Sequence, residues 1–130
     1  KLIAEGSGIL SLAALKKLHC KRKKVVSLIS GGNMDVMTIS SMINKGLISR
    51  GRILTFSVQL QDIPGQLEIV SRLLNECNAN VIGVEHNQFK NFARFSEVEL
   101  RVTCETNGEA HIQMIVDKFK ENGYTIVKIN

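Results

Sequence analysis

The chain has 130 residues, of which 44% are hydrophobic, so it is long enough for one ordinary domain with a buried core. Its apolar runs are too short for a membrane-spanning helix. Its three cysteines are odd in number and have no C-x-x-C spacing. This argues against a disulfide framework and favours a reducing cytoplasm. The net charge of +5 does not indicate nucleic-acid binding. Residues 1–50 carry nine Lys/Arg against two Asp/Glu, a net of +7, whereas residues 51–130 carry eight against ten, a net of −2.

The beginning of the chain is predicted to form a helix and then a buried strand. Residues 9–18 are rich in Ala, Leu and Lys, which favour helices. The four basic residues at 21–24 are interpreted as a solvated loop rather than as a phosphate-binding patch. The continuous apolar and β-branched run at 25–29 predicts a strand that is buried on both faces.

A second helix is predicted after the diglycine at 31–32. Apolar residues recur at spacings of three and four from Val36 to Leu47, which gives one apolar stripe along a helix. Asn33 or Asp35 is placed to begin this helix. Because a polar segment that includes Gly51 follows it, we expect one domain at 1–50 and another at 51–130.

The second part of the chain alternates between strand and helix patterns. Apolar and polar residues alternate in its first and third strands, which indicates strands with one face in water. The only proline, Pro64, lies in a turn before the first helix. The predicted elements are a strand at 53–61, a helix at 66–79, a strand at 81–89, a polar turn at 87–94, a strand at 95–106, a helix at 109–121 and a strand at 124–129.

This order, βαββαβ, predicts an α+β ferredoxin-like fold: one antiparallel four-stranded sheet with two helices on one face. Right-handed crossovers place the first and third strands in the centre. An RNA-recognition module has the same topology, but it stacks bases on aromatic side chains of the open sheet face. The residues expected on that face include no aromatic side chain: Thr55, Ser57, Gln59, Glu97, Glu99, Arg101 and Thr103.

A metal site is also not expected. The loop after the first strand contains no cysteine, and His19, His86 and His111 are too far apart in the sequence to suggest a ligand set.

The loop after the first strand, LQDIPGQL at 60–67, instead suits a small zwitterion. Gly65 permits a tight bend, the amides of the following helix suit a carboxylate, and Asp62 suits an ammonium group. An ordinary turn into a capped helix remains the alternative.

The loop at 60–67, the helix after it and the sequence ANVI at 79–82 together resemble the signature of ACT regulatory domains. The resemblance covers residues 52–130. It implies an amino-acid effector, with isoleucine or valine favoured, bound where two copies of the domain meet in a homo-oligomer. On this sequence the resemblance implicates Asp62, Ile63, Pro64, Gly65, Gln66, Leu67, Asn80 and Ile82. A purely structural oligomerisation domain without a ligand is the alternative.

The first 50 residues carry a second resemblance. EGSG at 5–8, a helix, and an apolar run leading into SGGN at 30–33 resemble the last segment of the catalytic domain of threonine ammonia-lyase (threonine dehydratase), which serine racemase and related fold-type II pyridoxal-phosphate enzymes share. The resemblance implies that Ser30 hydrogen-bonds the pyridine nitrogen of the cofactor in the intact enzyme and that Glu5 lies near it.

The same resemblance implies a parent enzyme that converts L-threonine to 2-oxobutanoate and ammonia. The family's Schiff-base lysine and glycine-rich phosphate loop lie upstream of this segment, and Lys16, Lys17, Lys23 and Lys24 are in contexts that do not match the lysine motif. We therefore expect no catalytic residue in these 130 residues and no pyridoxal phosphate bound to them alone.

Overall fold

The computed structural model describes residues 2–87 and 97–130. The chain forms two compact units, Lys1–Ile43 and Asn44–Asn130. The division falls within helix α2 (Val36–Ile48), a few residues before the predicted linker. The predicted polar turn at 87–94 lies, apart from Asn87, outside the described residues, as do the first two residues of the strand predicted at 95–106.

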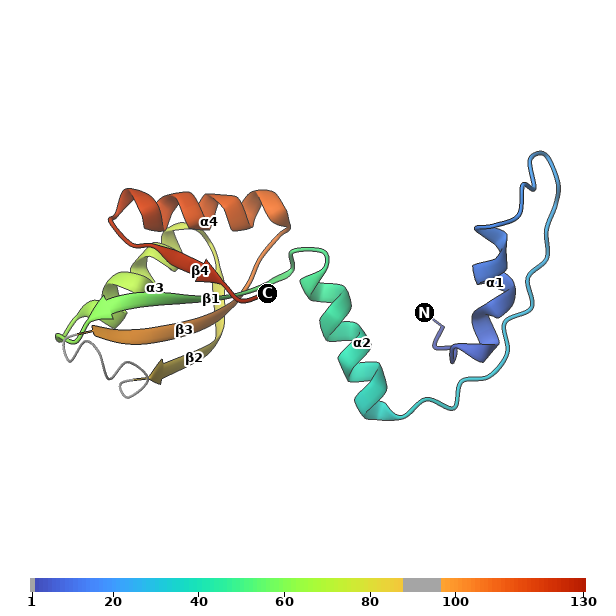
Figure 1. Ribbon diagram of the computed structural model, residues 1–130, viewed down its shortest axis with the longest axis horizontal. Coiled ribbons are helices and arrows are strands. Elements are labelled where there is room, and N and C mark those ends of the chain that lie inside the picture. The colour runs from blue at the N-terminus through green and yellow to red at the C-terminus, as the bar shows by residue number, and fades with distance from the viewer. Residues whose placement is uncertain (1, 88–96) are drawn as a thin grey trace. The chain divides into compact units, whose positions relative to one another are not determined.

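The larger unit has the predicted ferredoxin-like fold. Its four strands form one antiparallel sheet in the order β2-β3-β1-β4, so the first and third strands are central, as predicted. Helices α3 and α4 lie on one side of this sheet (Figure 1). The elements are β1 (Ile53–Gln61), α3 (Gln66–Glu76), β2 (Asn80–Asn87), β3 (Glu97–Glu105), α4 (Glu109–Glu121) and β4 (Ile126–Lys128).

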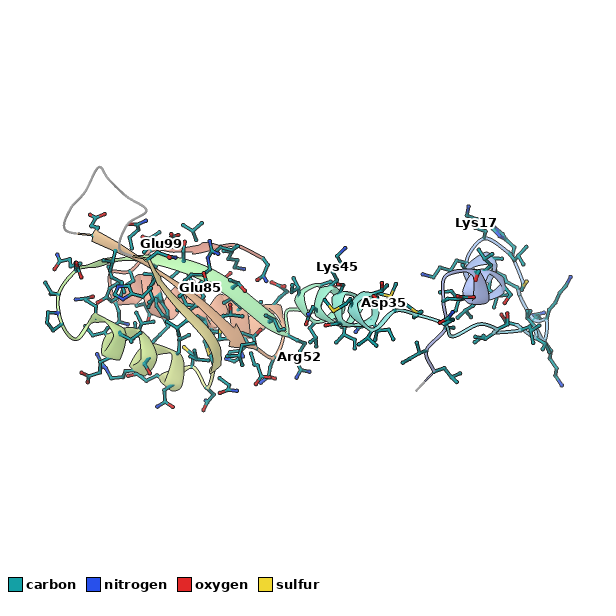
Figure 2. All side chains as sticks on the ribbon, turned by 90° about the horizontal axis from the view of Figure 1, so that it is seen from below. Lys17, Asp35, Lys45, Arg52, Glu85 and Glu99 are labelled. Atoms are coloured by element: carbon teal, nitrogen blue, oxygen red, sulfur yellow. The ribbon has the colours of Figure 1, made fainter. Side chains whose placement is uncertain are left out.

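The core lies between the sheet and the two helices. The apolar residues of β1 and β3 alternate with polar ones and are buried under the helices, because neighbouring residues of a strand point to opposite faces. Phe56 of β1 packs edge-on against Phe119 of α4, with ring centroids 5.4 Å apart. The opposite face of the sheet is polar: Figure 2 looks onto it, with Glu85 and Glu99 labelled.

The backbone at Gly51 ties the start of β1 to the start of α4. Its carbonyl oxygen accepts hydrogen bonds from the Thr106 hydroxyl at 2.6 Å and from the Gly108 amide at 2.8 Å. Gly51 has a φ of 59°, and a Cβ added there would lie 2.9 Å from the Glu109 nitrogen. The position therefore requires glycine for both its backbone conformation and its space.

Replacing Gly51 with alanine is expected to lower the free energy of unfolding by about 2 kcal/mol, because it adds both left-handed strain and a steric overlap. Gly46→Ala is the matched control. Gly46 lies inside α2, and the nearest atom to its added Cβ is 3.8 Å away, so alanine should be neutral or stabilising there. Urea unfolding followed by circular dichroism measures both, and equal effects would contradict the prediction.

The smaller unit differs from its prediction in one element. The first predicted helix, at 9–18, forms as η1 (Ser7–Ile9) and α1 (Leu10–Leu15), so it begins two residues earlier and ends three residues earlier than predicted. Helix α2 is confirmed, with Asp35 at its start. The Asp35 carboxylate accepts a hydrogen bond from the Thr38 amide at 3.1 Å.

The buried strand predicted at 25–29 is wrong. This segment has no strand structure, and Val26 and Leu28 are 97% and 79% exposed. A strand exists only through hydrogen bonds to a neighbouring strand, and no described strand of the chain pairs with this segment.

Among the described residues, no helix has the length and apolar character needed to cross a membrane.

Candidate functional site

A pocket of about 350 Å³ opens where the β1–α3 turn faces the end of β2. Six of the eight residues predicted to bind an effector lie around it, in the continuous stretch 62–67. The remaining walls come from the ends of the three neighbouring strands. The described residues of the lining are Leu60, Gln61, Asp62, Ile63, Pro64, Gly65, Gln66, Leu67, Val84, His86, Val98 and Leu100.

The turn before α3 lies in the pocket lining and leaves the start of this helix without a side-chain cap. The Ile63 amide donates to the Gln61 carbonyl at 2.9 Å, which closes a tight bend after β1. Gly65 has a φ of 94° at the N-cap of α3, and no side chain caps this helix. The amides of the first turn have no partners within the helix and carry the positive end of its dipole, so they are free to bind an anionic group.

The polar side chains of the pocket are few. Among the described lining residues, Asp62 and His86 are the only ones with an ionisable side chain, and both are exposed. The Gln66 side chain has a partner within the domain, because its Oε1 accepts a hydrogen bond from the Tyr124 hydroxyl at 3.3 Å. Of the described side chains, a ligand in this pocket would therefore meet one carboxylate and one imidazole.

Apart from Gln61, the rest of the described lining is apolar. Leu60, Val98 and Leu100 are buried and form the floor. Ile63 and Leu67, which are 53% and 55% exposed, form the rim. A second apolar groove of about 210 Å³ continues from Leu67 along β2, lined by Leu67, Val70, Ser71, Leu74, Val81, Val84 and Val102.

The other two predicted effector residues lie away from the pocket. Asn80 is at the opposite end of β2, where its Nδ2 donates to Glu105 Oε2 at 2.8 Å and it lines a separate polar pocket of about 230 Å³. Ile82 lies at a register shift of β2 and borders neither pocket. The prediction took residues from the start of β2, whereas the structure brings Val84 and His86 from its end to the loop.

The two segments of the smaller unit that resemble a cofactor site lie side by side. The Glu5 amide donates to the Gly31 carbonyl and the Ser30 amide donates to the Gly8 carbonyl, both at 3.2 Å. A Cβ on Gly8 would overlap the Ser30 carbonyl, so this approach needs glycine. The Ser7 hydroxyl donates to the Glu5 carboxylate at 2.9 Å. Ser30 is exposed, and its hydroxyl remains available as a hydrogen-bond donor.

The remaining histidine and cysteine residues of the larger unit have structural surroundings. His111 Nδ1 accepts from the Asn107 amide at 3.0 Å and Nε2 lies 2.6 Å from the Cys77 carbonyl, so Nε2 carries the hydrogen. Cys77 and Cys104 are buried, as expected of small apolar residues. Burial, and secondly the neighbouring Cys77, raises the pKa of the Cys104 thiol to about 11. No group of three potential metal ligands occurs within 2–87 and 97–130.

Two curated proteins match nearly the whole chain. An L-threonine ammonia-lyase of Geobacter sulfurreducens is 34% identical over 128 residues and one of Thermotoga maritima is 37% identical over 127, in each case over 97% of this chain. The chain is related to the threonine ammonia-lyases. It spans about a third of their length, 32% of each. A biosynthetic L-threonine dehydratase of Corynebacterium glutamicum is 40% identical over 67 residues. No family model matches the chain.

Proposed function

We propose that residues 51–130 form an amino-acid-binding regulatory domain of the ACT type in a threonine ammonia-lyase. The observation that carries this proposal is the 350 Å³ pocket around residues 62–67, which is large enough for one amino acid. The relationship to threonine ammonia-lyases supports a regulatory domain that belongs to such an enzyme.

The lining of the pocket matches a branched aliphatic amino acid. The Asp62 carboxylate suits the ammonium group, and the amides at the start of α3 suit the carboxylate. The apolar floor and rim suit a side chain such as that of isoleucine or valine, because burial of apolar surface stabilises the complex. Isoleucine and valine are therefore the proposed effectors.

A second copy of the domain is proposed to cover the exposed apolar edge at β2. This edge strand has eight residues, whereas the other edge, β4, has three. No described strand pairs with its outer edge, and an open strand edge with an apolar groove beside it favours pairing with another strand. Such pairing would place the pocket next to the junction of two copies. An effector that binds one arrangement of the copies more tightly than another would then regulate the attached catalytic domain.

The parent protein is proposed to be a cytoplasmic, pyridoxal-phosphate-dependent lyase that converts L-threonine to 2-oxobutanoate and ammonia. The cofactor would supply the electron sink of the elimination. The exposed Ser30 hydroxyl suits a hydrogen bond to its pyridine nitrogen, and the backbone pairing between residues 5–8 and 30–31 would hold Ser30 in place. Glu5 would lie beside it.

Calorimetric titration of the chain with a panel of amino acids tests the regulatory proposal. We expect heat from L-isoleucine or L-valine and none from L-lysine or L-glutamate, because a charged side chain would lose its hydration against the apolar floor. Sedimentation analysis of the same sample measures its oligomeric state. A stable oligomer that binds no amino acid would favour the alternative, a domain that only holds subunits together.

A further inference from the structure

We propose that His86 is a ligand-binding residue of this pocket, whose imidazole binds the carboxylate of the effector. The inference rests on the proposed function, because it concerns how the same pocket recognises an amino acid. His86 was not among the residues that the sequence resemblance implicates.

An irregularity of strand β2 is what brings His86 to the pocket. Val81 pairs with Cys104, on the helix-covered face of the sheet. Regular alternation from Val81 would place Gly83 and Glu85 on that face. The register instead shifts between Val81 and Gly83, so that Val84 pairs with Val102 and His86 with Leu100. The bulge therefore exchanges the two faces of the strand beyond it.

The exchange determines the charge that the ligand meets. Without the bulge, the carboxylate of Glu85 would face the pocket and would repel the carboxylate of an amino acid. With the bulge, Glu85 faces the open side of the sheet, where its Oε2 lies 3.5 Å from Arg101 Nη1. An imidazole then takes its place at the pocket.

The imidazole of His86 is available for a ligand. It has no hydrogen bond or ion pair in the described part of the chain, in contrast to His111, whose two ring nitrogens both have partners. Among the described lining residues, Asp62 on the β1–α3 loop is the only other one with an ionisable side chain. Glu97 and Glu99 of β3 belong to the opposite sheet face.

Recognition by an imidazole makes effector affinity depend on pH. Histidine is the side chain that ordinarily gains a proton between about pH 5 and 8, whereas aspartate stays ionised in that range. The protonated ring offers two N–H donors and a positive charge to a carboxylate, so the effector binds the protonated form more tightly. Affinity therefore increases as the pH falls.

Titration of the 130-residue chain with L-isoleucine at pH 5.5 and 8.5 tests the inference. We expect the Kd to be about threefold to tenfold lower at pH 5.5, the range for an exposed charge-assisted hydrogen bond. His86→Asn should remove this pH dependence, and His86→Lys should keep tight binding at both pH values, because its charge persists. Glu85→Gln, on the other face of the same strand, should retain the wild-type pH dependence.

The outcomes separate this inference from the proposed function. If the wild-type chain binds isoleucine or valine with the same Kd at both pH values, or if His86→Asn keeps the wild-type pH dependence, the role of His86 is overturned and amino-acid binding stands. If the wild-type chain binds no amino acid at either pH, the proposed function is overturned, and the role of His86 with it.

Discussion

Replacing Phe119 with alanine should lower the free energy of unfolding of the larger unit by about 3 to 5 kcal/mol, the usual cost of removing a fully buried aromatic ring. Phe119 has no exposed surface and stands at the centre of the core. Its ring packs edge-on against Phe56 and lies 6.4 Å, centroid to centroid, from Tyr124. Alanine would lose these contacts and leave a cavity between α4 and the sheet.

The measurement is urea unfolding followed by the fluorescence of Tyr124, the single tyrosine in a chain without tryptophan. Met114→Ala is the matched control, because Met114 lies on the same helix and is 48% exposed. It should change stability by less than about 1 kcal/mol. Phe119→Leu, which fills part of the cavity, should fall between the two variants. Equal losses for Phe119→Ala and Met114→Ala would show that the core is not where the structure places it.

Replacing Asp62 with asparagine should weaken the binding of L-isoleucine by about tenfold or more, because an ammonium group would lose a charged hydrogen-bond partner. Asp62 lines the pocket and makes no hydrogen bond or ion pair within the described residues. The substitution should therefore leave the free energy of unfolding within about 0.5 kcal/mol of that of the wild type. This combination of lost binding and unchanged stability is expected of a residue that contacts the ligand.

The matched control for Asp62 is Glu68→Gln. Glu68 is an exposed acidic residue in the first turn of α3 and is outside the pocket lining. Both variants remove one negative charge near the start of the same helix, so a general electrostatic effect would weaken binding equally in the two. Calorimetric titration of both variants with L-isoleucine compares them. Equal affinities would mean that the ammonium group is bound elsewhere.

Patterns of neighbouring residues were sufficient to predict most of the larger unit. The bounds of β1 and α4 were predicted to the residue, because alternation along a strand and three-to-four spacing along a helix depend only on residues close in sequence. The loop at 62–67 was also found from sequence, because a glycine and a proline must occupy particular places in so tight a bend.

Other features depend on strand pairing, which the local pattern does not contain. The bulge in β2 appears only in its register with β3, and it places His86 in the pocket lining. Asn80 and Ile82 lie outside this lining. The apolar run at 25–29 has the composition of a buried strand, but no described strand pairs with it. The composition of a segment indicates that it can form a strand. Whether it does depends on a second strand with which it can form hydrogen bonds.

The sequence by itself therefore determined the order of strands and helices in the larger unit, its two-layer fold and the loop that begins its pocket, since these follow from periodicity and turn chemistry. Only the tertiary structure decided which end of β2 faces that loop and which of its side chains a ligand would meet. The physical reason is that side chains of a strand alternate between two faces, so a shift of one residue in its pairing exchanges every side chain beyond it.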